Sequence, residues 1–207
     1  MNPSAPPDGF DKDERMRRIR LVALAVAVAF GLMSPAVAKA AKGSDAVLKL
    51  ADLPKDFVVQ AADTSKSRHK CLNWTQAINK GSSSAVRNTF GTDSEVVIHA
   101  VAVHPSAGSA SAGFAGLKAL VASCSSFAYK LDGSTLKVSF QPMNLTTSVK
   151  PDEFFAWKYA VKMGSMTVSS TVVLYRKETT VGFLADGGVF PDLDVYKLLL
   201  VKAIQRA

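Results

Sequence analysis

The chain has 207 residues and a formal net charge of +8; 48% of its residues are hydrophobic and 20% are charged. This length and composition are typical of one globular domain, which excludes a large multidomain enzyme and a disordered protein. The sequence contains no catalytic motif, and its most informative segment lies near the N-terminus.

That segment has the order of a signal peptide. Basic residues from Arg17 to Arg20 precede the apolar run Leu21–Met33, and the small residues Ala36 and Ala38 follow it. Small residues three and one positions before the cut suit signal peptidase, so we expect cleavage after Ala38, with Ala40 as the second choice. A retained membrane anchor is the alternative. The run is shorter than the roughly 20 apolar residues that a spanning helix needs.

Residues 1–15 are rich in Pro and Asp and do not resemble the start of a signal peptide. Our hypothesis is that translation starts at Met16 and that residues 1–15 are a misassigned extension; a genuine cytoplasmic tail is the alternative. The sequence therefore divides into 1–15, a signal peptide over 16–38, and a single domain over 39–207.

The charge of residues 39–207 bears on their partners. They carry 20 Lys or Arg and 13 Asp or Glu, a net charge near +7. The lysines are scattered from Lys42 to Lys202 without a basic stripe or a nucleic-acid-binding motif, so we expect no nucleic-acid partner. The charge favours at most a loose association with anionic envelope surfaces.

Secondary-structure signals in the first half of the domain alternate between helix and strand. Two helices are predicted, a short one over Asp45–Asp52 and a longer one whose apolar face runs from Phe114 to Cys124. Leu72–Ile78 is a short helix or turn. Strands are predicted over Asp56–Ala61, Ala85–Phe90 and Glu95–His104, and the last has apolar residues on both phases, as in a strand covered on both faces.

The second half reads as an antiparallel meander with a closing helix. Alternating apolar residues predict strands over Leu136–Gln141, Phe155–Met163, Met166–Tyr175 and Thr180–Ala185, and Asp186-Gly187-Gly188 is read as the turn that ends the last strand. Pro191–Arg206 is predicted to be a helix with an apolar stripe. Strands in runs with helices between them predict an α+β domain: a twisted antiparallel sheet of about six strands with two main helices packed on it.

The two cysteines, Cys71 and Cys124, both lie in the part expected to be exported. Oxidising compartments favour disulfides, and neither cysteine has metal-ligand spacing. We therefore predict one Cys71–Cys124 disulfide. It closes a loop of about 54 residues, which the chain-entropy model values at roughly 4 kcal/mol.

Neither a metal site nor a catalytic site is predicted. His99 and His104 are five residues apart on one strand, so alternation places them on opposite faces. No cluster has the spacing of zinc ligands, no G-x-S-x-G or S-x-x-K box accompanies the serines, and no cofactor is implied.

Two strand faces are candidate ligand-binding surfaces. Thr167, Ser169 and Thr171 share one phase of a strand and could line a groove with hydroxyl donors, although a solvated sheet face has the same pattern. The aromatic phase that includes Trp157 and Tyr159 could contact a ligand, although plain core has that pattern too.

Several segments together resemble the PknH-like extracellular sensor domain family of actinobacteria. They are LADLP at Leu50–Pro54, a cysteine about twenty residues later, the small-residue helix that ends in Cys124 (GFAGLKALVASC), and the meander with a final helix. The resemblance implies a disulfide-bonded sensor or ligand-binding domain outside the membrane, with a cleft over an antiparallel sheet. The chain departs from the family in having no kinase domain and only one potential disulfide.

We therefore expect a secreted, non-enzymatic domain that acts in the cell envelope or medium and binds a small molecule or an envelope component as a monomer. Two alternatives remain open: an exported hydrolase-type enzyme whose site is not readable from sequence, and a module that docks on another envelope protein. A cleft with a titratable group and a hydrogen-bonded partner would favour the enzyme. An exposed apolar patch of several hundred Å² would favour the docking module.

Overall fold

The structure is a computed structural model that describes residues 43–61, 69, 71, 74–131, 134–188 and 192–207. The predicted extension, the signal peptide and its cleavage residues Ala36 and Ala38 lie outside the described residues.

The centre of the domain is one antiparallel sheet, which has eight strands in the part of the chain that the structure describes. The order across the sheet is β1-β2-β3-β8-β7-β6-β5-β4. The strands are β1 (Val58–Val59), β2 (Ser84–Gly91), β3 (Glu95–Val103), β4 (Ser126–Leu131), β5 (Ser134–Pro142), β6 (Glu153–Met163), β7 (Met166–Lys177) and β8 (Thr180–Gly188). β5 to β8 form the predicted meander, β4 adds one further strand to it, and the pairing of β3 with β8 joins it to the N-terminal strands.

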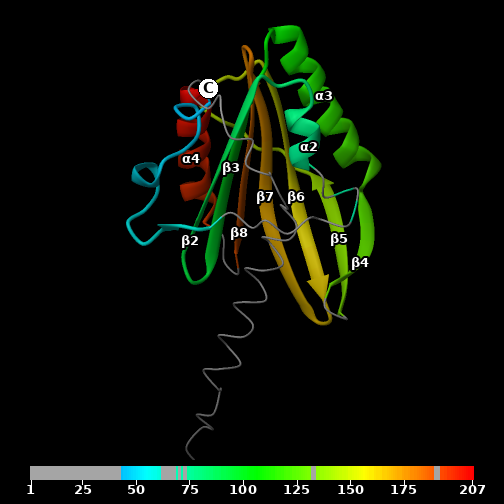
Figure 1. Cartoon of the computed structure of the whole chain (residues 1–207). Helices are drawn as coiled ribbons and strands as arrows, with labels where there is room; N and C mark the ends of the chain where they lie inside the picture. Colours follow the sequence, from blue (N-terminus) through cyan, green and yellow to red (C-terminus); the bar gives the residue numbers. More distant parts are fainter. Residues whose placement is uncertain (1–42, 62–68, 70, 72–73, 132–133, 189–191) are drawn as a thin grey trace, which may run out of the picture.

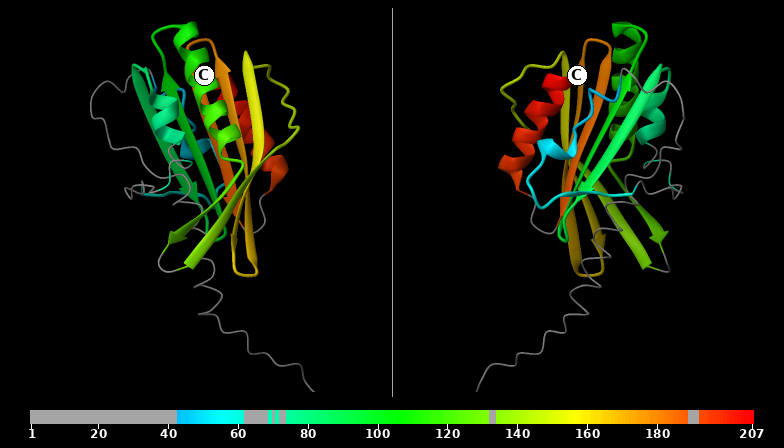
Figure 2. Two further views of the ribbon diagram at one scale, coloured as in Figure 1. Left: turned by 90° about the vertical axis from the view of Figure 1, so that its right-hand side faces the viewer. Right: turned by 60° about the vertical axis from the view of Figure 1, so that its left-hand side comes forward.

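Helices cover both faces of the sheet. Figure 1 shows α2 (Trp74–Asn79) and α3 (Ala107–Ser123) on one face and α4 (Leu193–Arg206) on the other. The segment that contains the 3-10 helix η1 (Leu50–Asp52) lies beside α4, as the right-hand view of Figure 2 shows. The order of the layers is therefore helix pair, sheet, and helix with the N-terminal segment.

Capping side chains define where both long helices begin. The Ser106 side chain accepts a hydrogen bond from the backbone N–H of Ser109 at the start of α3, and the Asp192 side chain accepts from Asp194 and Val195 at the start of α4. These side chains satisfy backbone donors that have no partner within the helix.

The main core lies between the sheet and the α2–α3 pair. Phe114, Leu117 and Val121 of α3 pack there against apolar side chains of the sheet. A disulfide joins Cys71 to Cys124, with 5.7 Å between their Cα atoms. It ties the chain just before α2 to the end of α3, and the predicted pairing is confirmed.

A second core lies under α4. Tyr196, Leu200 and Ile204 pack against Val173 and Leu184 of the sheet. β3 contributes to both cores, because Ile98 and Ala100 face α2 and α3 while Val97 faces the α4 side. The prediction that this strand is covered on both faces is confirmed.

The predicted α+β class and antiparallel sheet are confirmed, but three predicted details are wrong. The sheet has eight strands in the described residues where about six were predicted, because the sequence signals do not include β4; the strand predicted over Asp56–Ala61 is reduced to the two residues of β1. The predicted helix over Asp45–Asp52 is reduced to the single 3-10 turn η1. Asp186, Gly187 and Gly188 do not form a turn; they continue β8 and are buried, because β3 and β7 pair with them on either side.

Candidate functional site

The aromatic candidates Trp157 and Tyr159 lie in the main core. Both are fully buried on β6, beneath α2. Their rings lie edge-on to Trp74, with centroids 6.0 and 5.6 Å from its ring. Burial raises the pKa of the Tyr159 hydroxyl, which therefore stays neutral. With no exposed surface, neither side chain can touch a ligand that approaches this structure from solvent.

The hydroxyl candidates lie on the opposite side of the sheet. Thr167 is exposed and Ser169 and Thr171 are half-buried. In the register of β6 with β7 they pair with Lys162, Ala160 and Lys158. The structure therefore separates the five candidate residues into two sets on opposite faces of the sheet. Only the set with hydroxyl side chains, on β7, reaches solvent.

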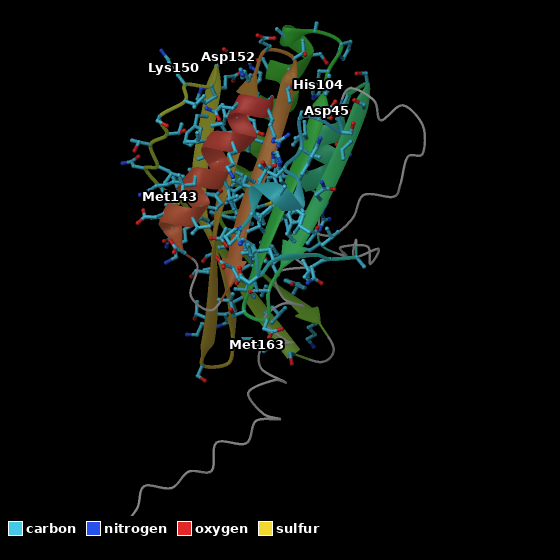
Figure 3. The ribbon with its side chains drawn as sticks, turned by 90° about the vertical axis from the view of Figure 1, so that its left-hand side faces the viewer. Asp45, His104, Met143, Lys150, Asp152 and Met163 are labelled. Atoms are coloured by element: carbon cyan, nitrogen blue, oxygen red, sulfur yellow. A yellow bond between two sulfur atoms is a disulfide. The ribbon has the colours of Figure 1, made fainter. Side chains whose placement is uncertain are left out.

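This side of the sheet is only partly covered. α4 and the second core extend over β6 and β7 as far as Ala156 and Val173. Figure 3 looks onto this side and shows the strands continuing past α4 towards Met163. We call the uncovered part the open face; it consists of Lys130, Lys137, Lys158, Lys162, Thr167, Ser169 and Thr171.

The open face is basic. Its four lysines are exposed, and within the described residues none has an ion pair or a hydrogen bond. Lys137 of β5 stands directly opposite Lys162 of β6. Like charges in direct cross-strand pairs repel each other and destabilise a sheet. The hydroxyls of β7 lie next to these ammonium groups, so the surface offers hydrogen-bond donors together with positive charge.

Acidic groups gather at the turn between β2 and β3 and extend to Asp186 of β8, which pairs directly with Thr171 of β7. A hollow of ≈ 400 Å³ lies at the turn between β2 and β3, and its lining includes Asp56 and Asp93. Nearby, the backbone N–H of Asp192 donates to the Glu95 carboxylate at 3.5 Å. Burial, and then the charge of Glu95, raise the pKa of Asp186 to about 8. This carboxyl is therefore largely protonated at neutral pH.

Two histidines are buried without forming a metal centre. His99 Nδ1 accepts a hydrogen bond from the backbone N–H of Leu48 at 2.8 Å, and Nε2 lies 2.8 Å from the Tyr175 hydroxyl. Burial lowers the pKa of His99 to about 3, so its ring is neutral. Within the described residues, no group of three His, Cys, Asp or Glu side chains could hold a metal ion.

A serine–histidine contact bears on the enzyme alternative. His104 Nδ1 lies 3.3 Å from the Ser109 hydroxyl at the first turn of α3. The imidazole is 2% exposed, and a Cβ at Gly113 would lie 2.9 Å from its Cε1. The ring is thus enclosed by α3, and the contact holds the start of this helix against the end of β3.

These features define a class: a two-cored α+β domain whose antiparallel sheet has a basic, hydroxyl-bearing open face. Neither the family models nor the curated proteins searched gave a match. In the part of the chain that the structure describes, we find no helix with the length and apolar character that crossing a membrane requires.

Solved structures show which fold this is. The chain resembles the extracellular domain of PknH from Mycobacterium tuberculosis, with a TM-score of 0.52 and 11% identity over 74% of this chain and 78% of that one. An uncharacterised protein from Mycobacterium smegmatis matches with a TM-score of 0.43 and 10% identity over 84% of this chain and 100% of its own. The first of these matches shows that this chain has the fold of the PknH extracellular domain, as its sequence segments predicted.

Proposed function

We propose that this chain is an exported, non-enzymatic, sensor-like domain that binds its ligand on the open face. The observation that carries the proposal is the contrast between the two sides of one sheet. The aromatic side is closed by α2 and α3, whereas the hydroxyls of Thr167, Ser169 and Thr171 are left on a side that α4 covers only in part. A rigid sheet holds its accessible donors at fixed positions, which suits it to binding.

Three further findings support the proposal. The fold is that of a domain described as extracellular, which is consistent with the signal peptide predicted from the sequence. The disulfide is consistent with an oxidising compartment. The serine–histidine pair at α3 is enclosed by the helix, which favours binding over hydrolysis.

Photo-crosslinking in the producing cells tests the binding surface even while the ligand is unidentified. Benzoylphenylalanine replaces Ser169 on the open face in one strain and Ala119, an exposed residue of α3, in the matched control. Intact mass should show a light-dependent adduct with a small molecule or envelope component at position 169 and none at 119. Equal adducts at both positions, or none at either, would contradict the open face as the binding surface.

Export is tested separately. Intact mass of the protein from medium and envelope fractions should show a chain that begins at Lys39. This chain should take up two alkyl groups only after reduction. A full-length, membrane-bound chain with free thiols would contradict export, cleavage and the disulfide together.

A further inference from the structure

The lysines of the open face form a two-dimensional array. Lys130, Lys137 and Lys162 lie on three neighbouring strands, β4, β5 and β6. Lys158 lies four residues before Lys162 on β6, which places it roughly 13 Å further along the strand. The outward-facing positions of β4 to β7 beyond α4 contain no Asp or Glu in the described residues.

This arrangement is costly for the isolated domain. Lys137 and Lys162 are directly opposed, and Lys130 lies diagonally across from Lys137 because it pairs with Thr135. Lysines often protect edge strands from unwanted pairing, and that role explains Lys130 on the edge strand β4. It does not explain Lys137, Lys158 and Lys162, because β5 and β6 are interior strands. Anions that approach the face would relieve this repulsion.

The distribution of charge indicates the shape of the anion. Lysines spread over three strands and about 13 Å match a plane of charges better than a single line of them. Asp56 and Asp93 lie at the turn between β2 and β3, towards the other edge of the sheet, so the described residues carry unlike charges at the two sides of the sheet. An anionic plane attracts the lysines of the open face and repels the carboxylates of Asp56 and Asp93, so the domain approaches the plane with its open face towards it.

We propose that the open face docks on a bilayer surface rich in anionic phospholipid headgroups, with Lys137, Lys158 and Lys162 as the main contacts. This inference rests on the open face being the binding surface of the proposed function, and it names the partner. Lysine ammonium groups contact the phosphates, and the hydroxyls of Thr167, Ser169 and Thr171 donate to headgroup oxygens. Because the contacts are electrostatic and exposed, salt weakens them.

Vesicle binding tests the proposal. The protein, in the form in which producing cells accumulate it, is co-sedimented with vesicles of equal parts phosphatidylglycerol and phosphatidylcholine, and with phosphatidylcholine alone. K137Q/K162Q should weaken binding to the anionic vesicles by about fivefold per lysine, or roughly 25-fold in all. The variant should fold at least as well as wild type, because it removes a repulsive pair.

K80Q/K150Q is the matched control. It changes the net charge by the same amount at exposed lysines outside the open face, and it should keep nearly all of the binding. An equal loss in both double variants would mean non-specific attraction and would overturn the proposal. Residues 21–33 are identical in all variants, and binding to phosphatidylcholine alone reports any contribution they make.

A measurement at single lysines gives a result that does not depend on residues 21–33. Acetylation rates of single lysines, followed by mass spectrometry, should fall on anionic vesicles at Lys137, Lys158 and Lys162 and stay unchanged at Lys80 and Lys150. If the protein binds long-chain polyphosphate more tightly than anionic vesicles at equal phosphate concentration, the proposal that the partner is a membrane surface is wrong. Unprotected open-face lysines alongside a persistent adduct at position 169 would overturn this inference and leave the proposed function standing.

Discussion

At the scale of single residues, His99 and Tyr175 of the sheet connect the segment before η1 with α4. Leu48 N–H donates to Nδ1, so the ring proton is on Nε2, which donates to the Tyr175 hydroxyl. That hydroxyl in turn donates to the carbonyl of Ala203 in α4 at 3.1 Å. The N-terminal segment, the sheet and α4 are thus joined through one buried chain of hydrogen bonds, in which every proton has an acceptor.

Tyr175→Phe tests this chain. It leaves the His99 N–H and the Ala203 carbonyl buried without partners, so the free energy of unfolding should fall by about 1–3 kcal/mol in urea titrations. Tyr129→Phe is the matched control, because the Tyr129 hydroxyl is buried with no hydrogen-bond partner among the described residues. If the two variants lose equal stability, the chain of hydrogen bonds has no special role.

Asp186 gives a second prediction at this scale. Its pKa of about 8 in the fold lies above its ordinary value of 3.8, so the folded protein keeps a proton that the unfolded chain loses. Stability should therefore fall as pH rises from about 4 to 8. The pKa of Glu95, which faces Asp186, is also raised, so its ionisation lowers stability over the same rise in pH. The negative charge of Asp192 raises the pKa values of both carboxyls further.

Asp186→Asn should remove most of this fall, because the amide stays neutral and can still donate a hydrogen bond. In thermal melts we expect the lead of the variant over wild type to grow by on the order of 10 °C between pH 5 and pH 9. Asp194→Asn, at an exposed position of α4, should track wild type at both values. A wild type whose melting temperature does not change between pH 5 and 9 would contradict the protonated carboxyl.

At the scale of elements, the disulfide holds α2 and α3 as a pair over the aromatic side of the sheet. It spans 53 positions of the chain. Replacing both cysteines by serine should lower the free energy of unfolding by about 4 kcal/mol, since the unfolded chain regains the freedom of that loop. Urea titration of the variant should match that of the reduced wild type. A loss below about 1 kcal/mol would mean that the unfolded chain stays compact without the bond.

Sequence patterns predict the elements whose periodicity is long and regular, and they fail where context overrides local signals. Alternation identifies β6 and β7, but Ser126–Leu131 follows Cys124 without a turn signal, so β4 is not predicted. Gly187-Gly188 looks like a turn, yet Gly188 is needed within β8, because a Cβ there would lie 2.6 Å from the Ser94 carbonyl oxygen. Strand crowding, which depends on tertiary pairing, decides such positions.

The candidate site is predictable only in part, for a related reason. Alternation alone places Thr167, Ser169 and Thr171 on one phase, and the structure keeps them together. The opposition of Lys137 and Lys162 depends on the register between β5 and β6, which no local pattern reveals. The sequence therefore indicates the hydroxyls of the open face but not the convergence of its charges.

At the scale of the whole molecule, the C-terminal helix α4 holds the segment around η1 in place. Arg206 of α4 pairs with the Asp52 carboxylate at 2.9 Å, and Lys202 donates to the Asp52 carbonyl at 2.8 Å. Burial alone would raise the pKa of Asp52, but the Lys49 N–H and Arg206 hold it below its ordinary value. The partly buried charge pair thus fixes the N-terminal segment over the second core.

Arg206→Gln should release this segment locally. Losing a charge-assisted contact of about 1–2 kcal/mol should speed proteolytic cleavage within residues 43–57 about 5- to 30-fold, while the rest of the domain stays resistant. Lys197→Gln removes an exposed ion pair of the same helix and should leave the cleavage rate unchanged. Uniform acceleration over the whole chain would point to global unfolding instead.

The pairing of β3 with β8 also sets the order in which the molecule can assemble. Ribosomes deliver the chain N-terminus first, so the β2–β3 hairpin and both cysteines emerge well before β8. Until β8 arrives, one edge of β3 has no partner and remains open to association with other chains. Contacts of such long sequence separation slow folding. The sheet can therefore be completed only after the last third of the chain has been delivered.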